Sequence, residues 1–155
     1  MCSTWPPGSV NATGAHGKAP AMLGGLSETP VGIVDVGSGA GFDSHVAAQC
    51  AGPTGWVIGV EMSPEMLQVA RPGLAASHVP RIRFVTGRAE ALPVRSAWAA
   101  LVISNGVLNL ATCKASAFAE VVRVLRPGGR FQAADLILLK DLPHDRRDDQ
   151  FAWSN

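Results

Sequence analysis

The chain has 155 residues, of which 47% are hydrophobic and 16% charged, and its net charge is +1. This length predicts one domain with a sizeable core, and the composition excludes a disordered chain. The balanced charge offers no basic surface for nucleic acid or for an anionic membrane. No apolar run reaches the ~18 residues that a membrane span needs, and no export signal is recognisable, so a cytoplasmic protein is expected.

Residues 1–29 are rich in Gly, Pro, Ser, Thr and Ala and show no sustained periodicity. They predict a flexible N-terminal arm, which leaves residues 30–155 as the single domain. The three cysteines have no CxxC spacing and the four histidines are scattered. The sequence therefore predicts no metal site.

From residue 31 the pattern alternates between buried strands and helices. Strands are expected over 31–36, 56–60, 81–86, 100–104 and 130–139, and helices over 42–51, 64–76 and 114–125. Ser63 is a good N-cap for the second helix, and the Arg-Pro-Gly-Gly run at 126–129 is expected to stop the third. This alternation predicts an α/β fold with a Rossmann-like, doubly wound parallel sheet, whose ligands lie at the carboxyl ends of the strands.

The first strand leads into a glycine-rich loop at residues 35–41, which reads DVGSGAG. Gly37, Gly39 and Gly41 carry no Cβ, so the chain can turn tightly and a ligand can lie against its backbone. The loop opens into a helix N-terminus, whose free N–H groups favour electron-rich ligand atoms. The spacing is GxGxG with Asp35 before it, whereas a dinucleotide fingerprint reads GxGxxG. A nicotinamide-dependent oxidoreductase is therefore disfavoured.

Further candidate ligand contacts follow the second and third strands. Glu61 ends the second strand, where an acid accepts hydrogen bonds from vicinal ribose hydroxyls. Met62 either lies against a purine face or simply packs. After the third strand, the backbone N–H of Ala89 is placed to reach an adenine nitrogen, and Arg88 either covers the ring or faces solvent. These residues predict a site for an adenosine group.

Polar residues also end the fourth strand, beside the expected crevice. Ser104 and Asn105 follow an apolar run and need hydrogen-bond partners, so both are expected to face the ligand. Asp43, just past the glycine loop, either stabilises the helix dipole or meets a positively charged cofactor. Glu90 is expected to be an acid at a helix start. No residue stands out as a general base, and no catalytic residue is assigned.

With these segments, the chain resembles the class I S-adenosylmethionine-dependent methyltransferases. The resemblance covers about residues 23–150 and is carried by VDVGSGAG, by the acid in VIGVEM, by GRAEALP and by VVRVLRPGGRF. Within that superfamily it is most similar to the arsenite methyltransferases. The segments that carry this closer similarity are GSGAGFDSHVAA, GPTGWVIGVEMSPEML, ISNGVLNL and DLPHDRRDDQFAW.

The resemblance implies strand order 3-2-1-4-5, followed by two more strands, and S-adenosylmethionine as the cofactor. By position, the loop at residues 35–41 would hold the methionine end of that cofactor. Glu61 would hold the ribose, and Met62 and Ala89 would contact the adenine. Asn105 would line the site of methyl transfer.

The chain departs from the arsenite group at Gly106, where that group places a cysteine. Trivalent arsenic prefers thiolate ligands, and neither Cys50 nor Cys113 falls at a family arsenic-ligand position. The chain also stops soon after the fifth strand, so a C-terminally truncated domain is expected. Its fifth strand would then be an apolar edge over 131–139, open to self-association.

The sequence thus predicts a small-molecule methyltransferase similar to arsenite methyltransferases, with no nucleic-acid or membrane partner. In-line methyl transfer depends mainly on proximity and orientation, which fits the lack of an evident general base. The alternative is a truncated or catalytically silent module that binds the cofactor without turnover. The methyl acceptor is left open.

Overall fold

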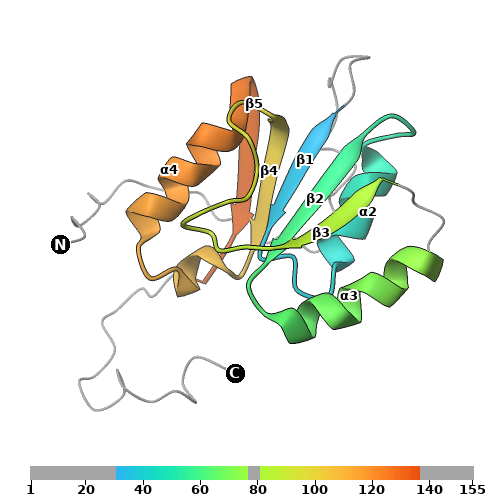
Figure 1. The fold of residues 1–155 in the computed structure, drawn as a ribbon. Helices are drawn as coiled ribbons and strands as arrows, with labels where there is room; N and C mark the ends of the chain where they lie inside the picture. Colours follow the sequence, from blue (N-terminus) through green and yellow to red (C-terminus); the bar gives the residue numbers. More distant parts are fainter. Residues whose placement is uncertain (1–30, 77–80, 137–155) are drawn as a thin grey trace, which may run out of the picture.

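The computed structural model describes residues 31–76 and 81–136, which build one parallel sheet between helices (Figure 1). The strands are β1 (Gly32–Val36), β2 (Trp56–Glu61), β3 (Ile82–Thr86), β4 (Ala99–Asn105) and β5 (Leu125–Ala134). They are ordered β3-β2-β1-β4-β5, and every neighbouring pair is parallel. The predicted doubly wound sheet and its strand order are confirmed. Strand order reverses between β1 and β4, so a ligand crevice is expected at their carboxyl ends.

The helices form two layers on opposite faces of the sheet. In Figure 1, α2 (Phe42–Cys50) and α3 (Pro64–Ala76) cover one face, and α4 (Lys114–Val124) covers the other. Alternate residues of a strand serve the two layers, so Ile33 packs into the cluster under α2 and α3, and Val34 into the cluster under α4. Within the two described ranges no helix is both long and apolar enough to cross a bilayer.

β1 is the central strand, and all of its five residues are buried. A strand covered on both faces is apolar almost throughout, which explains the continuous run that predicted it. The start of α3 also follows from sequence, because the backbone N–H of Met66 donates to Ser63 Oγ at 3.2 Å. This bond confirms Ser63 as the N-cap. Rigid strands and capped helices thus hold the loops that leave the carboxyl edge of the sheet.

The largest departure from the predicted elements lies at the start of β5. This strand begins at Leu125, not at residue 130, and the Arg-Pro-Gly-Gly run lies inside it. The register with β4 shifts between the pairs Ala99–Leu125 and Leu101–Arg130, so the run is a bulge. Gly128 has a φ of +75°, which glycine adopts without strain. A bulge and a turn share the same residues, and the sequence pattern does not separate them.

β5 lies at one edge of the sheet, as the strand order predicts. Its residues are half-buried or exposed, in contrast to the fully buried β1. Phe131 is half-buried and packs edge-on against Phe118 of α4, with ring centroids 6.1 Å apart. This part of the expected apolar edge is thus covered on one face by α4. β5 ends at Ala134, so the strand prediction is wrong at residues 135–136. The last part of that prediction, at 137–139, and the predicted arm at 1–29 lie outside the described residues.

Candidate functional site

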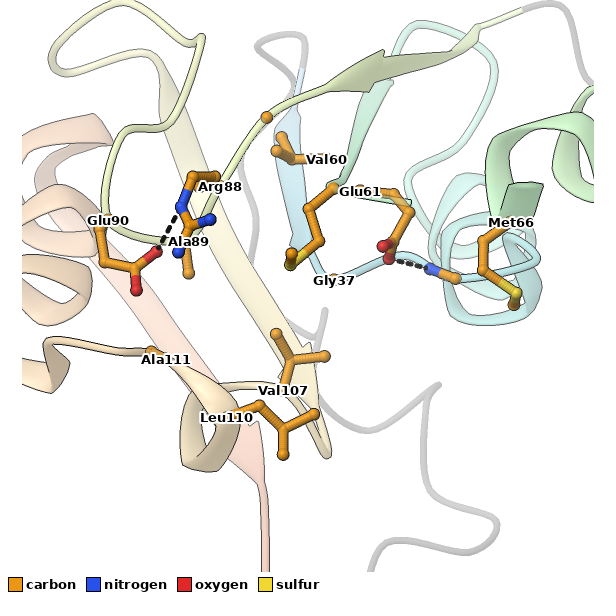
Figure 2. A pocket seen from close by; sticks show the side chains of 13 residues that line it. Gly37, Val60, Glu61, Met66, Arg88, Ala89, Glu90, Val107, Leu110 and Ala111 are labelled. Carbon is orange, nitrogen blue, oxygen red and sulfur yellow. Dashed lines mark hydrogen bonds and ion pairs between the residues drawn. The ribbon is translucent and has the colours of Figure 1, made fainter. Parts of the chain in front are cut away.

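A pocket of about 280 Å³ opens at the carboxyl ends of β1, β2 and β3 (Figure 2). It lies beside the point where strand order reverses, where sheets of this type bind ligands. Six of the ligand residues predicted from sequence line it: Gly37, Gly39, Glu61, Met62, Arg88 and Ala89. Loops from three strands that are separate in sequence thus meet at one cavity.

The glycine loop forms one wall of the pocket. The N–H of Gly37 donates to the carbonyl oxygen of Val60 at 2.8 Å, which ties the loop to the end of β2. Gly37 has a φ of +73°, and a Cβ added there would overlap the side chain of Val107 from the opposite wall. Among the described residues, a Cβ on Gly39 would meet only the Cε of Met66, at 3.6 Å. The loop therefore touches the far wall at Gly37 and leaves open space for a ligand at Gly39.

Glu61 is the most constrained polar group in the pocket. The residue is 9% exposed. Its Oε2 accepts the N–H of Gly39 at 3.0 Å, and its Oε1 accepts the N–H of Ser63 at 2.8 Å. A carboxylate has about four acceptor positions, so each oxygen keeps one for a ligand. Glu61 is thus a fixed acceptor that can take two vicinal hydroxyl groups.

Asp35 lies near the end of β1, shortly before the turn at Gly37, and does not line the pocket. It is buried and accepts a hydrogen bond from Ser44 Oγ of α2 at 2.6 Å. Burial raises the pKa of Asp35 from its ordinary 3.8 to about 7; the hydrogen bond from Ser44 opposes this rise, and the nearby carboxylates of Asp43 and Glu61 add to it. In this structure the Asp35 side chain thus joins the end of β1 to α2.

Two more predicted loop residues also lie outside the pocket lining. Gly41 has a φ of +88° and precedes α2, and a Cβ there would overlap the ring of Phe84. Gly41 is therefore required by packing between the loop and β3. Ser38 is buried, and its Oγ has no hydrogen-bond partner among the described residues.

The polar residues at the end of β4 contact protein groups instead of the pocket. Ser104 is buried, and its Oγ donates to the carbonyl oxygen of Val36 at 3.2 Å. Asn105 Nδ2 donates to Asp43 Oδ2 at 3.1 Å. These two bonds join the end of β4 to the end of β1 and the start of α2. Neither residue is among those that line the pocket.

The turn after β3 forms the second wall, together with the segment before α4. Arg88 Nε lies 3.6 Å from Glu90 Oε2, and Arg88 Nη2 donates to Thr112 Oγ1 at 3.3 Å. Glu90 Oε1 accepts the N–H of Thr112 at 2.8 Å. The expectation that Glu90 opens a helix is wrong, because no helix follows it. Its carboxylate instead joins two loops that both line the pocket.

The apolar part of this wall comes from a short 3-10 turn, η1 (Leu108–Leu110), which the sequence did not predict. Val107, Leu110 and Ala111 line the pocket from here (Figure 2). The N–H of Asn109 donates to Asp135 Oδ2 at 2.9 Å, so the residue that directly follows β5 holds this turn. The apolar residues in VLNLA, at 107–111, were the sequence signal that could have indicated this part of the wall. Their place beside the glycine loop, however, follows only from the fold.

The sequence missed seven lining residues, most of which contribute backbone or apolar surface. They are Val60, Met66, Gly87, Glu90, Val107, Leu110 and Ala111. Across the described part of the chain, no three His, Cys, Asp or Glu side chains are grouped so that they could hold a metal ion. The pocket thus combines a fixed carboxylate, open backbone and an apolar wall, which suits a ribose-bearing ligand with an aromatic base.

A family model described as a methyltransferase domain matches residues 29–155. The chain belongs to this methyltransferase domain family. The domain is 45% identical to the arsenite methyltransferase of Halobacterium salinarum over 113 residues. This alignment covers 73% of this chain and 29% of that protein. The domain is 33% identical to the arsenite methyltransferase of Aquipseudomonas alcaligenes over an alignment of 156 residues. This alignment covers 96% of this chain and 43% of that protein.

Solved structures agree with this family. An arsenic(III) S-adenosylmethionine methyltransferase from Chlamydomonas reinhardtii superposes with a TM-score of 0.69 at 29% identity, over 86% of this chain and 54% of that one. An S-adenosylmethionine-dependent methyltransferase structure from Methanococcus maripaludis gives a TM-score of 0.67 at 26% identity, over 74% of this chain and 52% of that one.

The resemblance to class I S-adenosylmethionine-dependent methyltransferases, with arsenite methyltransferases among the most similar, is therefore confirmed. S-adenosylmethionine is the cofactor named for these neighbours. The methyltransferase domain spans less than half the length of the curated relatives just described, 29% and 43%.

Proposed function

We propose that residues 30–155 form the cofactor-binding domain of a small-molecule methyltransferase similar to arsenite methyltransferases, with S-adenosylmethionine bound in the pocket. The observation that carries this proposal is the carboxylate of Glu61. Two backbone N–H groups fix it beside an open glycine loop, and it keeps two acceptor positions for the ribose hydroxyls. The family match supports the same ligand.

The two walls divide the proposed ligand between them. The adenine lies between Met62 and the apolar side chain of Leu110, with the N–H of Ala89 and the guanidinium of Arg88 at its edge. The loop at 37–41 faces the methionine end, because its backbone is open at Gly39 and it leads into the N-terminus of α2, whose first N–H groups have no partner within the helix and suit the carboxylate of that group. Asp35, Ser104 and Asn105 hold the ends of β1 and β4 and the start of α2 together around this loop, and Ser38 lies buried within it.

The residues of this chain bind and orient, and none is required to move a proton. S-adenosylmethionine supplies an electrophilic methyl group on a sulfonium. Glu61 and the glycine loop fix the position of that group relative to the acceptor, which is the main contribution that a protein makes to an in-line displacement. An acceptor that is already nucleophilic needs no general base beside it.

The acceptor in this proposal is a small molecule. The matched relatives are named arsenite methyltransferases, yet no cysteine is found among the residues that line the described pocket. Gly106 has a φ of +68°, and a Cβ there would have no neighbour within 4 Å in the described part of the chain. Since trivalent arsenic prefers thiolates, this observation favours a second candidate function, which is cofactor binding without methylation of arsenite.

Calorimetric titration with S-adenosylhomocysteine tests the first part of the proposal. We expect saturable binding of one molecule per chain, and its absence would refute both candidate functions. Transfer of a labelled methyl group to arsenite in the presence of a thiol then separates them. Turnover supports the methyltransferase, and binding without turnover supports the silent module.

We also propose that β5, which among the described strands pairs with β4 alone, mediates self-association. Size-exclusion chromatography with light scattering over a range of protein concentrations tests this. A dimer that dissociates on dilution is the expected result, and a monomer at all concentrations contradicts it.

A further inference from the structure

The part of the second pocket wall that follows β3 belongs to a segment with little regular secondary structure. Residues 87–98, between β3 and β4, contain a single isolated bridge, between Arg88 and Ala91. Buried backbone groups in such a segment need hydrogen-bond partners from elsewhere. Leu92 and Val94 are buried, and both belong to the core cluster beneath α4. The partners of this segment therefore decide where the pocket wall lies.

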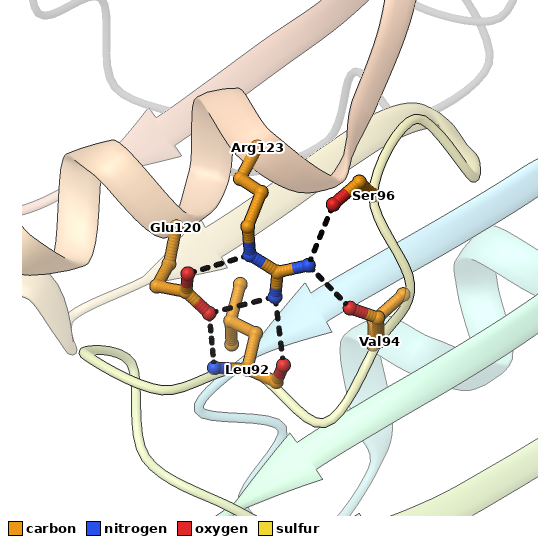
Figure 3. A network of polar contacts seen from close by, with 5 residues as sticks. All are labelled: Leu92, Val94, Ser96, Glu120 and Arg123. Atoms are coloured by element: carbon orange, nitrogen blue, oxygen red, sulfur yellow. Dashed lines mark hydrogen bonds and ion pairs between the residues drawn. The ribbon is translucent and has the colours of Figure 1, made fainter.

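Two side chains of α4 supply those partners (Figure 3). Arg123 Nη2 donates to the carbonyl oxygen of Leu92 at 2.9 Å, and Arg123 Nη1 donates to that of Val94 at 2.8 Å. Arg123 Nη1 also donates to Ser96 Oγ at 3.2 Å. Glu120 Oε2 accepts the N–H of Leu92 at 2.7 Å. The pair thus holds residues 92–96 by both donors and acceptors.

Arg123 and Glu120 are also bonded to each other in the two-pronged geometry of a guanidinium and a carboxylate. Arg123 Nε lies 2.6 Å from Glu120 Oε1, and Nη2 lies 2.7 Å from Oε2. The hydrogen bonds from Arg123 hold the pKa of Glu120 below its ordinary value. The two side chains are 34% and 19% exposed. A planar guanidinium can make all these bonds at once, whereas an ammonium group cannot.

Both parts of the second pocket wall are connected to this one helix. Residues 87–90 continue directly into the segment that Arg123 and Glu120 hold. The η1 side of the wall continues through Thr112 into the first turn of α4, and Thr112 is bonded to Arg88 and Glu90. α4 thus fixes two loops that line one cavity, although its Glu120–Arg123 pair is not among the lining residues.

We infer that Arg123 and Glu120 are positioning residues for the cofactor pocket, which set the place of the Arg88–Glu90 turn against the glycine loop. This inference rests on the proposed cofactor function. The predicted effect is on the affinity for the adenosine part of the ligand, through the backbone of Ala89 and its neighbours. The glycine-loop wall is held by β1 and β2 and is expected to be unaffected.

The test compares Arg123→Ala, Arg123→Lys and Glu120→Gln with Arg71→Ala, which removes an exposed arginine of α3 far from the pair in sequence. Calorimetry with S-adenosylhomocysteine and with adenosine is done at a temperature where each variant is folded by circular dichroism. For Arg123→Ala we expect both ligands to bind about 10-fold more weakly, which is about 1.4 kcal/mol. Arg123→Lys and Glu120→Gln should each bind both ligands about 3-fold more weakly, and Arg71→Ala should bind them as the natural chain does.

A second readout separates positioning from a general loss of stability. Amide hydrogen exchange in Arg123→Ala should become faster over residues 87–96 and stay unchanged over residues 37–41. If Arg123→Ala does not fold, Arg123→Lys and Glu120→Gln carry the same expectation. Folded variants that bind both ligands as the natural chain does would overturn the inference while leaving the proposed function intact. A natural chain that binds neither ligand would overturn both.

Discussion

The two walls of the pocket are held in place by different parts of the chain. The glycine loop, which forms the first wall, directly follows β1, and the N–H of Gly37 donates to the carbonyl oxygen of Val60 in β2. The opposite wall consists of the turn after β3 and the η1 segment, which are joined by side chains. Glu90 and Thr112, for example, are 22 residues apart in sequence.

This difference predicts how each wall responds to substitution. Buried strands fix the position of the glycine loop. Substitutions there therefore act through the space available around the backbone and through the buried carboxyl of Asp35. The second wall depends on exposed or half-buried side chains, whose bonds individually contribute about 1 kcal/mol. Substitutions in the first wall should therefore have the larger effects.

Asp35→Asn should produce the largest effect, on stability. The pKa of Asp35 is raised to about 7 in the folded chain, so its favourable contribution is complete below its unfolded value of 3.8 and is lost as the pH rises through about 7. At about pH 4 the variant and the natural chain should be equally stable. At about pH 8 the variant should be more stable by up to about 4 kcal/mol, since each pKa unit corresponds to about 1.4 kcal/mol.

Urea denaturation at a series of pH values measures this effect. Ser44→Ala is the matched control, because it removes the hydrogen bond that lowers the pKa of Asp35. Its stability should fall more steeply than that of the natural chain as the pH rises toward about 8. Parallel stability curves for Asp35→Asn and the natural chain between about pH 4 and 8 would contradict the buried, raised carboxyl.

Gly37→Ala should have the next largest effect, on binding. The φ of +73° is strained for alanine, and the added Cβ would overlap Val107. Because overpacking typically costs about 1–3 kcal/mol, we expect the affinity for S-adenosylhomocysteine to fall about 100-fold. Calorimetry on the folded variant measures this.

Two further variants show whether contact between the walls is the cause. In the Gly37→Ala background, Val107→Ala should recover part of the lost affinity, because it removes the methyl groups that the new Cβ would meet. Gly106→Ala is the control, because Gly106 has a comparable φ of +68° but a Cβ there would meet no described residue within 4 Å. It should change the affinity less than about 3-fold, with a stability loss near 1 kcal/mol. Equal losses of affinity in both glycine variants would show that backbone strain alone is responsible.

Much of the first wall could be predicted from sequence because its causes are local. The GxGxG spacing, the buried run of β1 and the acid that ends β2 each act within a few residues, so the glycine loop and Glu61 were found. Asp35 was also expected at the ligand, but its neighbour Ser44 lies on the next helix, and only the packing of α2 on the sheet reveals that bond.

The second wall was harder to predict because its causes are distant in sequence. Glu90 was expected at a helix start, since an acid after a turn is common there, but its partner Thr112 lies beyond β4. Val107 and Leu110 belong to an apolar run typical of many segments. Only the sheet order, which brings the end of β4 beside the glycine loop, makes them pocket residues.

Glu61→Gln should weaken binding of S-adenosylhomocysteine about 10-fold, or about 1.4 kcal/mol. The amide keeps one acceptor, so it can satisfy either Gly39 or Ser63 but leaves the other N–H facing an NH₂ group. Glu65→Gln, on the exposed first turn of α3, is the matched control and should bind normally. For a ligand that lacks the ribose hydroxyls, Glu61→Gln and the natural chain should have the same affinity. If that difference persists, Glu61 acts by holding the loop and not by contacting the ribose.

Leu110→Ala should have the smallest effect, and it tests whether the apolar part of the second wall serves binding or folding. Leu110 is 64% exposed although it lines the pocket, so its truncation should change the free energy of unfolding by less than about 0.5 kcal/mol. A bound adenine would cover part of this surface, and at about 25 cal/mol per Å² the lost contact corresponds to an affinity about 3-fold lower. Val122→Ala, which truncates an exposed side chain of α4, should change neither quantity. A Leu110→Ala variant that is clearly less stable yet binds normally would place this side chain in the fold and not in the site, and the contrast between the two walls would then rest on Arg88 and Glu90 alone.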